Sequence, residues 1–151
     1  MNSAVNHPDL PQLMLKARGK LMDHFRPILN HFRITEQQWR ILRALDAHAQ
    51  LEPRELGELC QISSPSMAGV LARMEETGII GRARMAGDQR RVIVRLSAQG
   101  QQLLSQVGPL IDAQYGHIEQ ACGTEIFTEL VDVMQRFVAL NERAIQTVAL
   151  P

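Results

Sequence analysis

Apolar residues recur at every third or fourth position along the first third of this chain, a spacing that places them on one face of an α-helix. The run from Leu10 to Phe32 predicts a long helix with one buried stripe. A second helix is expected to start at Thr35 and to run to about Ala47, because Thr35 and Gln38 have the spacing of a capping box. The first third of the chain is therefore expected to be helical.

The same spacing returns after Ser97 and continues almost to the end of the chain. Ser97 is a suitable N-cap for a long helix, which Gly108 and Pro109 are expected to bend or interrupt. A last helix is expected from Thr124, with apolar residues at helical spacing as far as Ile145. These apolar stripes are wider than one small domain can bury, so they leave a surplus of apolar surface.

Between Gly81 and Ser97 the pattern changes to the alternation of a β-hairpin. Gly87 and Asp88 favour a turn, because glycine accepts positive φ and aspartate bonds its own backbone two residues on. The strand after the turn has an apolar face, formed by Val92, Val94 and Leu96. Its other face is cationic and is formed by Arg91, Ile93 and Arg95. This segment holds five of the sixteen Lys and Arg residues, which favours contact with a phosphate backbone. The alternative is a solvated hairpin whose arginines only discourage edge pairing.

A short helix is expected just upstream of this hairpin, from Pro53 to Leu59. Proline suits the first turn of a helix, and Leu56 and Leu59 are three positions apart on one face. A small polar turn over residues 60–64 follows. The chain then has the residues that start another helix.

Ser63 or Ser64 is a good N-cap for a helix from Pro65 to about Thr77, and Gly78 would end it in a left-handed conformation. Two short helices joined by a tight turn fit a helix-turn-helix, although alone they also fit an ordinary helical hairpin. The basic hairpin that follows favours the first interpretation. The predicted fold is a mainly α winged helix-turn-helix with long N- and C-terminal helices.

The run LGELCQISSPSMAGVLARMEETGIIGRARMAGDQRRVIVRLSAQG resembles the MarR family of bacterial transcription regulators. Asp88 and Arg90 match the Asp-x-Arg wing signature of the family, and Leu96, Ser97 and Gly100 match its Leu-Thr-x-x-Gly helix start, with Ser in place of Thr. The resemblance implies a cytoplasmic homodimer that places each recognition helix in a major groove. It implies a DNA-binding domain over residues 35–97, with residues 1–34 and 98–151 forming a helical dimerisation region.

The stretch FRPILNHFRITEQQWRILRAL, from Phe25 to Leu45, is similar to the regulators of homoprotocatechuate (4-hydroxyphenylacetate) degradation operons within that family. This similarity implies a repressor of an aromatic-acid catabolic operon. Its effector would be a small aromatic acid such as 4-hydroxyphenylacetate or 3,4-dihydroxyphenylacetate.

Charge is distributed unevenly in a chain whose formal net charge is zero. Residues 61–97 hold six arginines against three acidic residues, a local charge of +3 that leaves −3 elsewhere. A DNA-facing module on a body that does not bind DNA would show this asymmetry. The sequence shows neither a signal peptide nor an apolar run of membrane-spanning length, so a cytoplasmic location is expected.

DNA contacts are expected from the start of the recognition helix and from the wing. Hydroxyls bond bases or phosphates, a thioether touches a thymine methyl, and arginine suits both phosphate and the minor groove. Arg90 at the wing tip is expected to enter the minor groove, whereas Arg73 contacts phosphate or pairs with Glu76. Asp88 is expected to structure the wing instead of touching DNA. The predicted DNA-binding residues are Ser63, Ser64, Ser66, Met67, Arg73, Arg84, Gln89, Arg90 and Arg91.

An aromatic carboxylate needs a cation and an aromatic wall. The candidates on the first two helices are Arg18, His24, Arg26, Trp39 and Arg40. Each has an alternative: Trp39 as plain core, His24 on a helix flank, and Arg26 and Arg40 in surface pairs with Asp23 and Glu36.

Other classes of protein have weaker support. A redox-responsive regulator would use Cys60 or Cys122, which are expected to be inert thiols in a reducing cytoplasm. A metal-responsive regulator would need ligands, but the five histidines are scattered. A non-specific architectural DNA-binding protein stays open. The sequence lacks a Gly-rich phosphate loop and a nucleophile elbow, so we expect neither an enzyme nor a cofactor.

Overall fold

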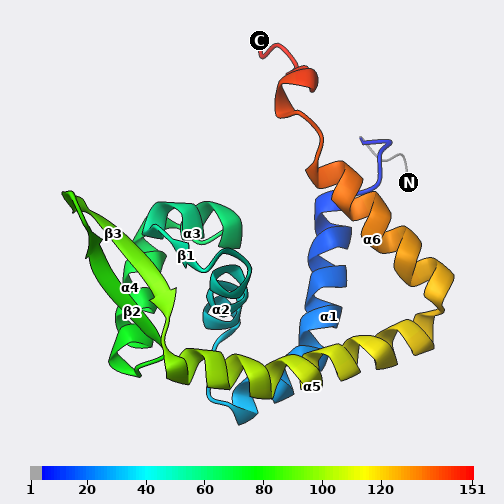
Figure 1. The fold of residues 1–151 in the computed structure, drawn as a ribbon. Helices are drawn as coiled ribbons and strands as arrows, with labels where there is room; N and C mark the ends of the chain where they lie inside the picture. The colour runs from blue at the N-terminus through cyan, green and yellow to red at the C-terminus, as the bar shows by residue number, and fades with distance from the viewer. Residues whose placement is uncertain (1–4) are drawn as a thin grey trace. The chain divides into compact units, whose positions relative to one another are not determined.

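The structure is a computed structural model that describes residues 5–151. Two compact units are present, one extending to Asp112 and the other from Ala113 to Pro151. The elements, labelled in Figure 1, are α1 (Leu10–His31), α2 (Glu36–His48), β1 (Gln50–Leu51), α3 (Pro53–Cys60), α4 (Ser64–Glu76), β2 (Ile80–Met85), β3 (Asp88–Leu96), α5 (Ala98–Cys122), α6 (Thr124–Val138) and a 3₁₀ turn (Glu142–Ala144).

The predicted starts of α1 and α2 are both fixed by capping hydrogen bonds. The Asp9 carboxylate accepts the backbone N–H of Gln12 at 3.1 Å, so α1 begins where its sequence pattern begins. Thr35 and Gln38 form the reciprocal capping box, with an N–H to side-chain oxygen distance of 3.0 Å in one direction and 3.1 Å in the other. Both predicted helix starts are confirmed.

The C-terminal helices differ from the prediction at two points. Helix α5 is continuous through Pro109, so of the two predicted outcomes, a bend or an interruption, the interruption does not occur; losing one N–H donor leaves the flanking turns intact. Helix α6 ends at Val138, well short of Ile145. The Asn141 side chain accepts the Arg143 N–H at 3.0 Å and starts a separate 3₁₀ turn, which accounts for the earlier end of the helix.

The core of the first unit lies among α2, α3, α4 and the sheet. Its fully buried side chains include Ile41, Leu42, Leu45, Leu56, Leu71, Met74 and Val94. On α3 the inward pair is Leu56 and Cys60, whereas Leu59, which was predicted to share the face of Leu56, is 53% exposed. On α1 only the C-terminal half is buried, through Phe25 and Leu29, whereas Leu10 and Leu13 are exposed.

A three-stranded antiparallel sheet in the order β1-β3-β2 completes the first unit. Strands β2 and β3 form the predicted hairpin, which projects past α4 in Figure 1. The short strand β1 pairs Leu51 with Val94 of β3 and had no sequence signal. Ile93, predicted on the cationic face, is buried like its neighbour Val94, because β1, α2 and α3 all contact β3.

The second unit contains the end of α5 and all of α6. The Tyr115 and Phe127 rings meet edge to face, with centroids 6.3 Å apart. In the single chain α6 has no buried residue. Its exposed apolar side chains include Ile126, Leu130, Val133 and Phe137, which recur at helical spacing.

Candidate nucleic-acid interface

Helix α4 presents a small polar start to solvent. Ser63 is the extended N-cap residue, and its hydroxyl donates to the Ser66 hydroxyl at 3.1 Å. Ser63, Ser64, Pro65 and Ser66 are all exposed. This end of the helix therefore offers hydroxyls and free backbone N–H groups to an approaching phosphate or base edge.

Met67 does not belong to this exposed surface. Its side chain is 2% exposed and lies on the inward face of α4 together with Val70, Leu71 and Met74. Residues three, four and seven positions apart share one helix face, so Met67 packs with the core of the domain. The prediction that its thioether touches DNA is wrong.

The end of α4 is fixed to the start of α5. Gly78 has φ +78°, and the N–H groups of Gly78 and Ile79 bond the carbonyls of Glu75 and Met74, each at 3.0 Å. The Ser97 hydroxyl donates to the Gly78 carbonyl at 2.5 Å and accepts the Gly100 N–H at 3.0 Å. The left-handed end at Gly78 and the N-cap at Ser97 are both confirmed, and together they join α4, the hairpin and α5.

A two-residue turn, Ala86–Gly87, forms the tip of the wing. Gly87 has φ +88°, and the Asp88 carboxylate accepts the backbone N–H of Arg90 at 3.0 Å. Asp88 therefore structures the wing by holding the backbone of Arg90, whose side chain is exposed.

Two ion pairs anchor the base of the wing to α4 and to the residue that caps α3. Arg82 of β2 bonds both carboxylate oxygens of Glu75 on α4, with N–O distances of 3.0 and 3.2 Å. This bond holds the pKa of Glu75 below its usual range and raises the pKa of Arg82. Arg91 of β3 bonds the carboxylate of Glu52, with its Nε at 2.8 Å, and this bond raises the pKa of Arg91. The wing is thus tied to the helices at both strands.

The remaining arginines of the basic segment fall into two groups. Arg84 donates to the backbone carbonyl of Gln89 across the hairpin, and Arg95 donates to the Gln50 side chain. Arg73 and Arg90 are exposed and make no ion pair within residues 5–151, so the predicted alternative of an Arg73–Glu76 pair does not form. Arg73 and Arg90 are the cations of this segment best placed to meet a phosphate.

Three of the predicted ligand residues are bound to other groups of the chain. Arg18 pairs with Glu36, and Arg26 pairs with Asp23 as its alternative predicted. The alternative of an Arg40–Glu36 pair is wrong, because Arg40 instead donates to the backbone carbonyls at the end of α3, those of Cys60 and Gln61. Helix α3 ends with unsatisfied carbonyls, which gives Arg40 a structural role.

The other two predicted ligand residues are divided between core and surface. Trp39 is buried and His24 is exposed. Trp39 therefore matches its alternative as a core residue, whereas His24 lies on a flank of α1.

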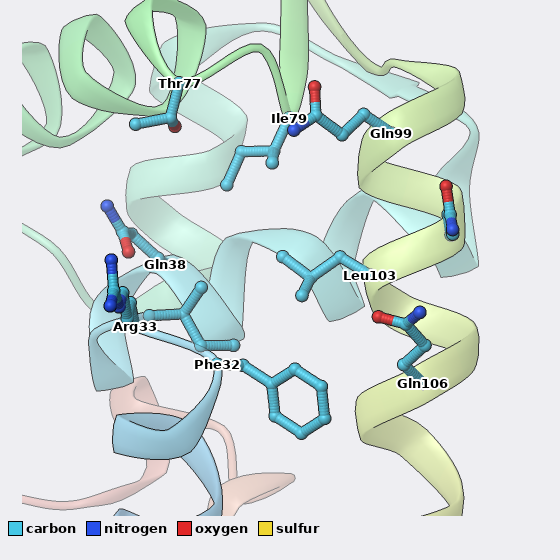
Figure 2. A pocket seen from close by; sticks show the side chains of 10 residues that line it. Phe32, Arg33, Gln38, Thr77, Ile79, Gln99, Leu103 and Gln106 are labelled. Carbon is cyan, nitrogen blue, oxygen red and sulfur yellow. The ribbon is translucent and has the colours of Figure 1, made fainter.

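A hollow of about 410 Å³ lies elsewhere in the first unit, and Figure 2 shows its lining. It is bounded by the α1–α2 corner, the C-terminal end of α4 and the first half of α5. The lining residues are Phe32, Arg33, Ile34, Gln38, Thr77, Ile79, Gln99, Gln102, Leu103 and Gln106. None of them was among the predicted ligand residues, although the glutamines at 99, 102 and 106 have the three-and-four spacing of one helix face and were a signal to follow.

The redox-responsive and metal-responsive alternatives depend on the cysteines and on clustered metal ligands. Cys60 is buried, and burial raises the pKa of its thiol while Arg40 opposes the rise. Cys122 is exposed. Among residues 5–151 no three His, Cys, Asp or Glu side chains gather closely enough to hold a metal ion. Over the same residues no helix has both the length and the apolar character to cross a membrane.

Helices α2 to α4 and the anchored basic hairpin define a winged helix-turn-helix protein. The sequence profile of the MarR family matches residues 34–92. The HTH-type transcriptional regulator FarR of Neisseria gonorrhoeae is 34% identical over 142 residues, which cover 94% of this chain and 97% of that protein. The homoprotocatechuate degradative operon repressor of Escherichia coli is 34% identical over 135 residues, which cover 89% of this chain and 91% of that protein. The chain belongs to the MarR family of transcriptional regulators.

The fold agrees with this assignment. The crystal structure of NadR in complex with 4-hydroxyphenylacetate is 35% identical, with a TM-score of 0.81 over 93% of this chain and all of that one. The family resemblance carried by the wing and recognition-helix motifs is therefore confirmed, as is the winged helix-turn-helix fold.

Proposed function

We propose that this protein is a homodimeric, cytoplasmic repressor that binds a pseudo-palindromic operator and is released by a small aromatic acid. The observation that carries the DNA-binding half is the wing, whose tip exposes Arg90 while Asp88 fixes its backbone. Ion pairs to Glu52 and Glu75 hold the base of the same hairpin. A hairpin fixed in this way is prepared to enter a groove with little further loss of conformational entropy.

The DNA contacts divide by chemistry. Ser63, Ser64 and Ser66 at the start of α4 meet base edges or phosphates in the major groove. Arg73 contacts phosphate, and Arg90 with Gln89 beside it enters the minor groove. Arg84 and Arg91 supply positive potential near the backbone from positions fixed by Gln89 and Glu52.

The relatives support the effector half of the proposal. One is named as a homoprotocatechuate degradative operon repressor, and one solved neighbour holds 4-hydroxyphenylacetate. The proposed effector is therefore 4-hydroxyphenylacetate or 3,4-dihydroxyphenylacetate. Arg18, His24, Arg26 and Trp39 remain the proposed contacts. Arg18 and Arg26 would exchange their partners Glu36 and Asp23 for the ligand carboxylate, whereas Arg40 holds the backbone at the end of α3.

Dimerisation uses the terminal helices. The apolar side chains of α6 and of the first turns of α1 are exposed in the single chain, and a second copy would bury them. Residues 1–34 and 98–151 form this dimerisation region, and residues 35–97 form the DNA-binding domain.

Fluorescence anisotropy tests the proposal directly. The protein is titrated onto labelled intergenic DNA from upstream of its own gene, with a scrambled duplex as the control, and the titration is repeated with 4-hydroxyphenylacetate and 3,4-dihydroxyphenylacetate. We expect site-specific binding that falls steeply with salt and that one of the two acids relieves. Equal affinity for the scrambled duplex would instead indicate an architectural protein, and binding that neither acid relieves would contradict the proposed effector.

A further inference from the structure

We propose that Arg84 is a positioning residue for DNA recognition. It holds a bulge of the wing that aims Gln89 and Arg90 at the minor groove, and it does not itself bind a phosphate. This role of Arg84 rests on the proposed DNA-binding function, because it acts through the wing-tip contact. Composition gives Arg84 and Arg90 the same charge, whereas the pairing of the two wing strands gives them different tasks.

The two strands of the wing change register near its tip. Arg84 of β2 pairs with Val92 of β3, whereas the next residue of β2, Met85, pairs with Asp88. One step along β2 therefore spans the stretch from 92 to 88 on β3, and residues 89–91 fall between two successive partners of β2. A bulge of this kind bends its strand and re-aims the side chains that it carries. The tip of the hairpin in Figure 1 thus carries three residues that the strand ladder does not hold.

Side chains take the place of the ladder in holding the bulge. The Arg84 guanidinium donates to the backbone carbonyl of Gln89, and the Asp88 carboxylate accepts the backbone N–H of Arg90 at 3.0 Å. The third bulge residue is held through its side chain, by the ion pair with Glu52. Backbone groups that leave a ladder need other partners, and here neighbouring side chains supply them. Each residue of the bulge is therefore fixed by a different side chain.

The hydrogen bond of Arg84 directs its charge into the hairpin. Its guanidinium is bound to the backbone that it supports, whereas the side chains of Gln89 and Arg90 are exposed and available to DNA. A narrow minor groove attracts arginine, and glutamine is suited to the acceptors on the edges of A·T pairs. The contribution of Arg84 to recognition is therefore the orientation of the two residues that meet the groove.

A fixed bulge lowers the entropy that binding must remove. With both backbone bonds in place, the exposed side chain of Arg90 starts from one backbone position and enters the groove with little further ordering. Without the Arg84 bond, the carbonyl of Gln89 turns to water and the bulge samples several positions. The loss of Arg84 should consequently matter only while Arg90 is present to be positioned.

A double-mutant cycle between Arg84→Met and Arg90→Ala tests this dependence. Methionine keeps an unbranched apolar stem and removes both the donor and the charge. Arg95→Met is the matched control, because it removes the same charge from an exposed arginine of β3 outside the bulge. Anisotropy on the labelled upstream duplex gives the affinity of the full chain for every combination.

We expect Arg84→Met to weaken operator binding about three- to tenfold when Arg90 is present, and by less than about twofold when position 90 is alanine. Arg95→Met should have one and the same effect in both backgrounds. Equal losses from Arg84→Met in the two backgrounds would overturn the proposal, because an arginine that binds its own phosphate contributes independently of Arg90.

Asp88 provides the companion test with a conservative variant. Asp88→Ala removes the acceptor of the Arg90 N–H and should couple to Arg90 as Arg84→Met does. Asp88→Asn keeps a side-chain oxygen and should retain most of the affinity. Melting temperatures should stay unchanged in these variants, since the substituted side chains are exposed on the hairpin. Equal losses in Asp88→Asn and Asp88→Ala would contradict the proposal, because charge and not the backbone bond would then matter.

Amide hydrogen exchange of the DNA-free protein, followed by NMR, separates this proposal from the proposed function. The Arg90 N–H should exchange about tenfold faster in Arg84→Met than in the unaltered protein, with no change in Arg95→Met. Unchanged exchange in Arg84→Met overturns its hold on the bulge even if the operator is bound. Equal affinity for the upstream and scrambled duplexes removes the proposed function, while the exchange rates still decide whether Arg84 fixes the bulge.

Discussion

At the scale of single residues, the structure separates arginines that are free to meet DNA from arginines that hold the fold. Arg73 and Arg90 are exposed, whereas Arg82 and Arg91 bond carboxylates of Glu75 and Glu52. Composition counts all of them equally in the local charge of the basic segment. Their partners decide which of them can bind a phosphate at little cost, because a paired arginine must first break its bond to a carboxylate.

Replacing Arg90 by alanine should weaken operator binding by about 1–3 kcal/mol, because the side chain is the exposed cation at the wing tip. Anisotropy measures the affinity, and sedimentation should show an unchanged oligomeric state. Lys20→Ala, which removes an exposed cation from α1, serves as the control and should leave affinity unchanged. Equal affinities for Arg90→Ala and the unaltered protein would rule out the wing-tip contact.

The two cysteines should differ strongly in reactivity. Burial raises the pKa of the Cys60 thiol above its ordinary 9.0, so at pH 7–8 its reactive thiolate is rarer than in an exposed cysteine. Iodoacetamide should therefore modify exposed Cys122 first, and Cys60 should react appreciably only as the pH rises above 9.0. Mass spectrometry follows both sites. Faster labelling of Cys60 at pH 7 would revive the redox-responsive alternative.

At the scale of elements, the junction of α4, the hairpin and α5 depends on a close backbone approach. A Cβ added to Gly100 would lie 2.0 Å from the carbonyl oxygen of Ile79. Backbone atoms yield less readily than flexible side chains, so α5 would have to move away from the end of α4. The close approach to the Ile79 carbonyl thus explains why this chain needs a glycine at position 100, which matches the family's helix-start motif.

Gly100→Ala should lower the free energy of unfolding by about 1–3 kcal/mol, as overpacking does in tightly packed sites. Gly69→Ala is the matched control: it is exposed within α4, has no atom within 4 Å of its added Cβ, and should stabilise the helix by up to about 1 kcal/mol. Urea denaturation measures both. Similar small effects of the two substitutions would show that the junction tolerates the added methyl group.

Glu52→Gln tests whether Arg91 positions the wing or binds phosphate. If Glu52 holds Arg91 in place, its loss should loosen the hairpin and weaken operator binding about two- to fivefold, the scale of one partly exposed ion pair. Glu58→Gln removes the same charge from an exposed position of α3 and controls for the change in net charge. Tighter binding by Glu52→Gln than by the control would mean that Arg91 is released to a phosphate.

At the scale of the whole molecule, the main feature of the single chain is an exposed apolar stripe on α6. Ile126, Leu130, Val133 and Phe137 of α6 form a stripe with no buried member. Contiguous apolar stripes on a soluble protein mark interaction surfaces. A two-fold dimer would cover this stripe, and it would also set the spacing of two recognition helices on DNA.

Leu130→Glu should dissociate the proposed dimer, because its interface would then contain two unpaired carboxylates, one from each protomer, at a cost of at least about 3 kcal/mol. Sedimentation velocity should show monomers, and operator affinity should fall with them. Gln135→Glu introduces the same charge outside the stripe and should leave the dimer intact. An unchanged dimer in Leu130→Glu would place the interface elsewhere.

The sequence alone determined the features that depend on local chemistry. Capping by Thr35 and Ser97, the left-handed end at Gly78 and the turn at Gly87 each involve residues a few positions apart, so their hydrogen bonds or backbone angles follow from residue type. The order of the winged-helix elements followed from the same local signals. The wing motif then led to the MarR family.

Only the tertiary structure decided which side chains are free. Met67 lies at the polar start of α4, yet its side chain packs in the core. Arg40 lies on the predicted ligand face, yet it donates hydrogen bonds to the backbone at the end of α3. The hollow around Arg33 also joins segments that are tens of positions apart along the chain. Such outcomes depend on packing between distant segments, which no local pattern encodes. The wing could therefore be predicted from the sequence, whereas the candidate effector sites could be located only in the folded chain.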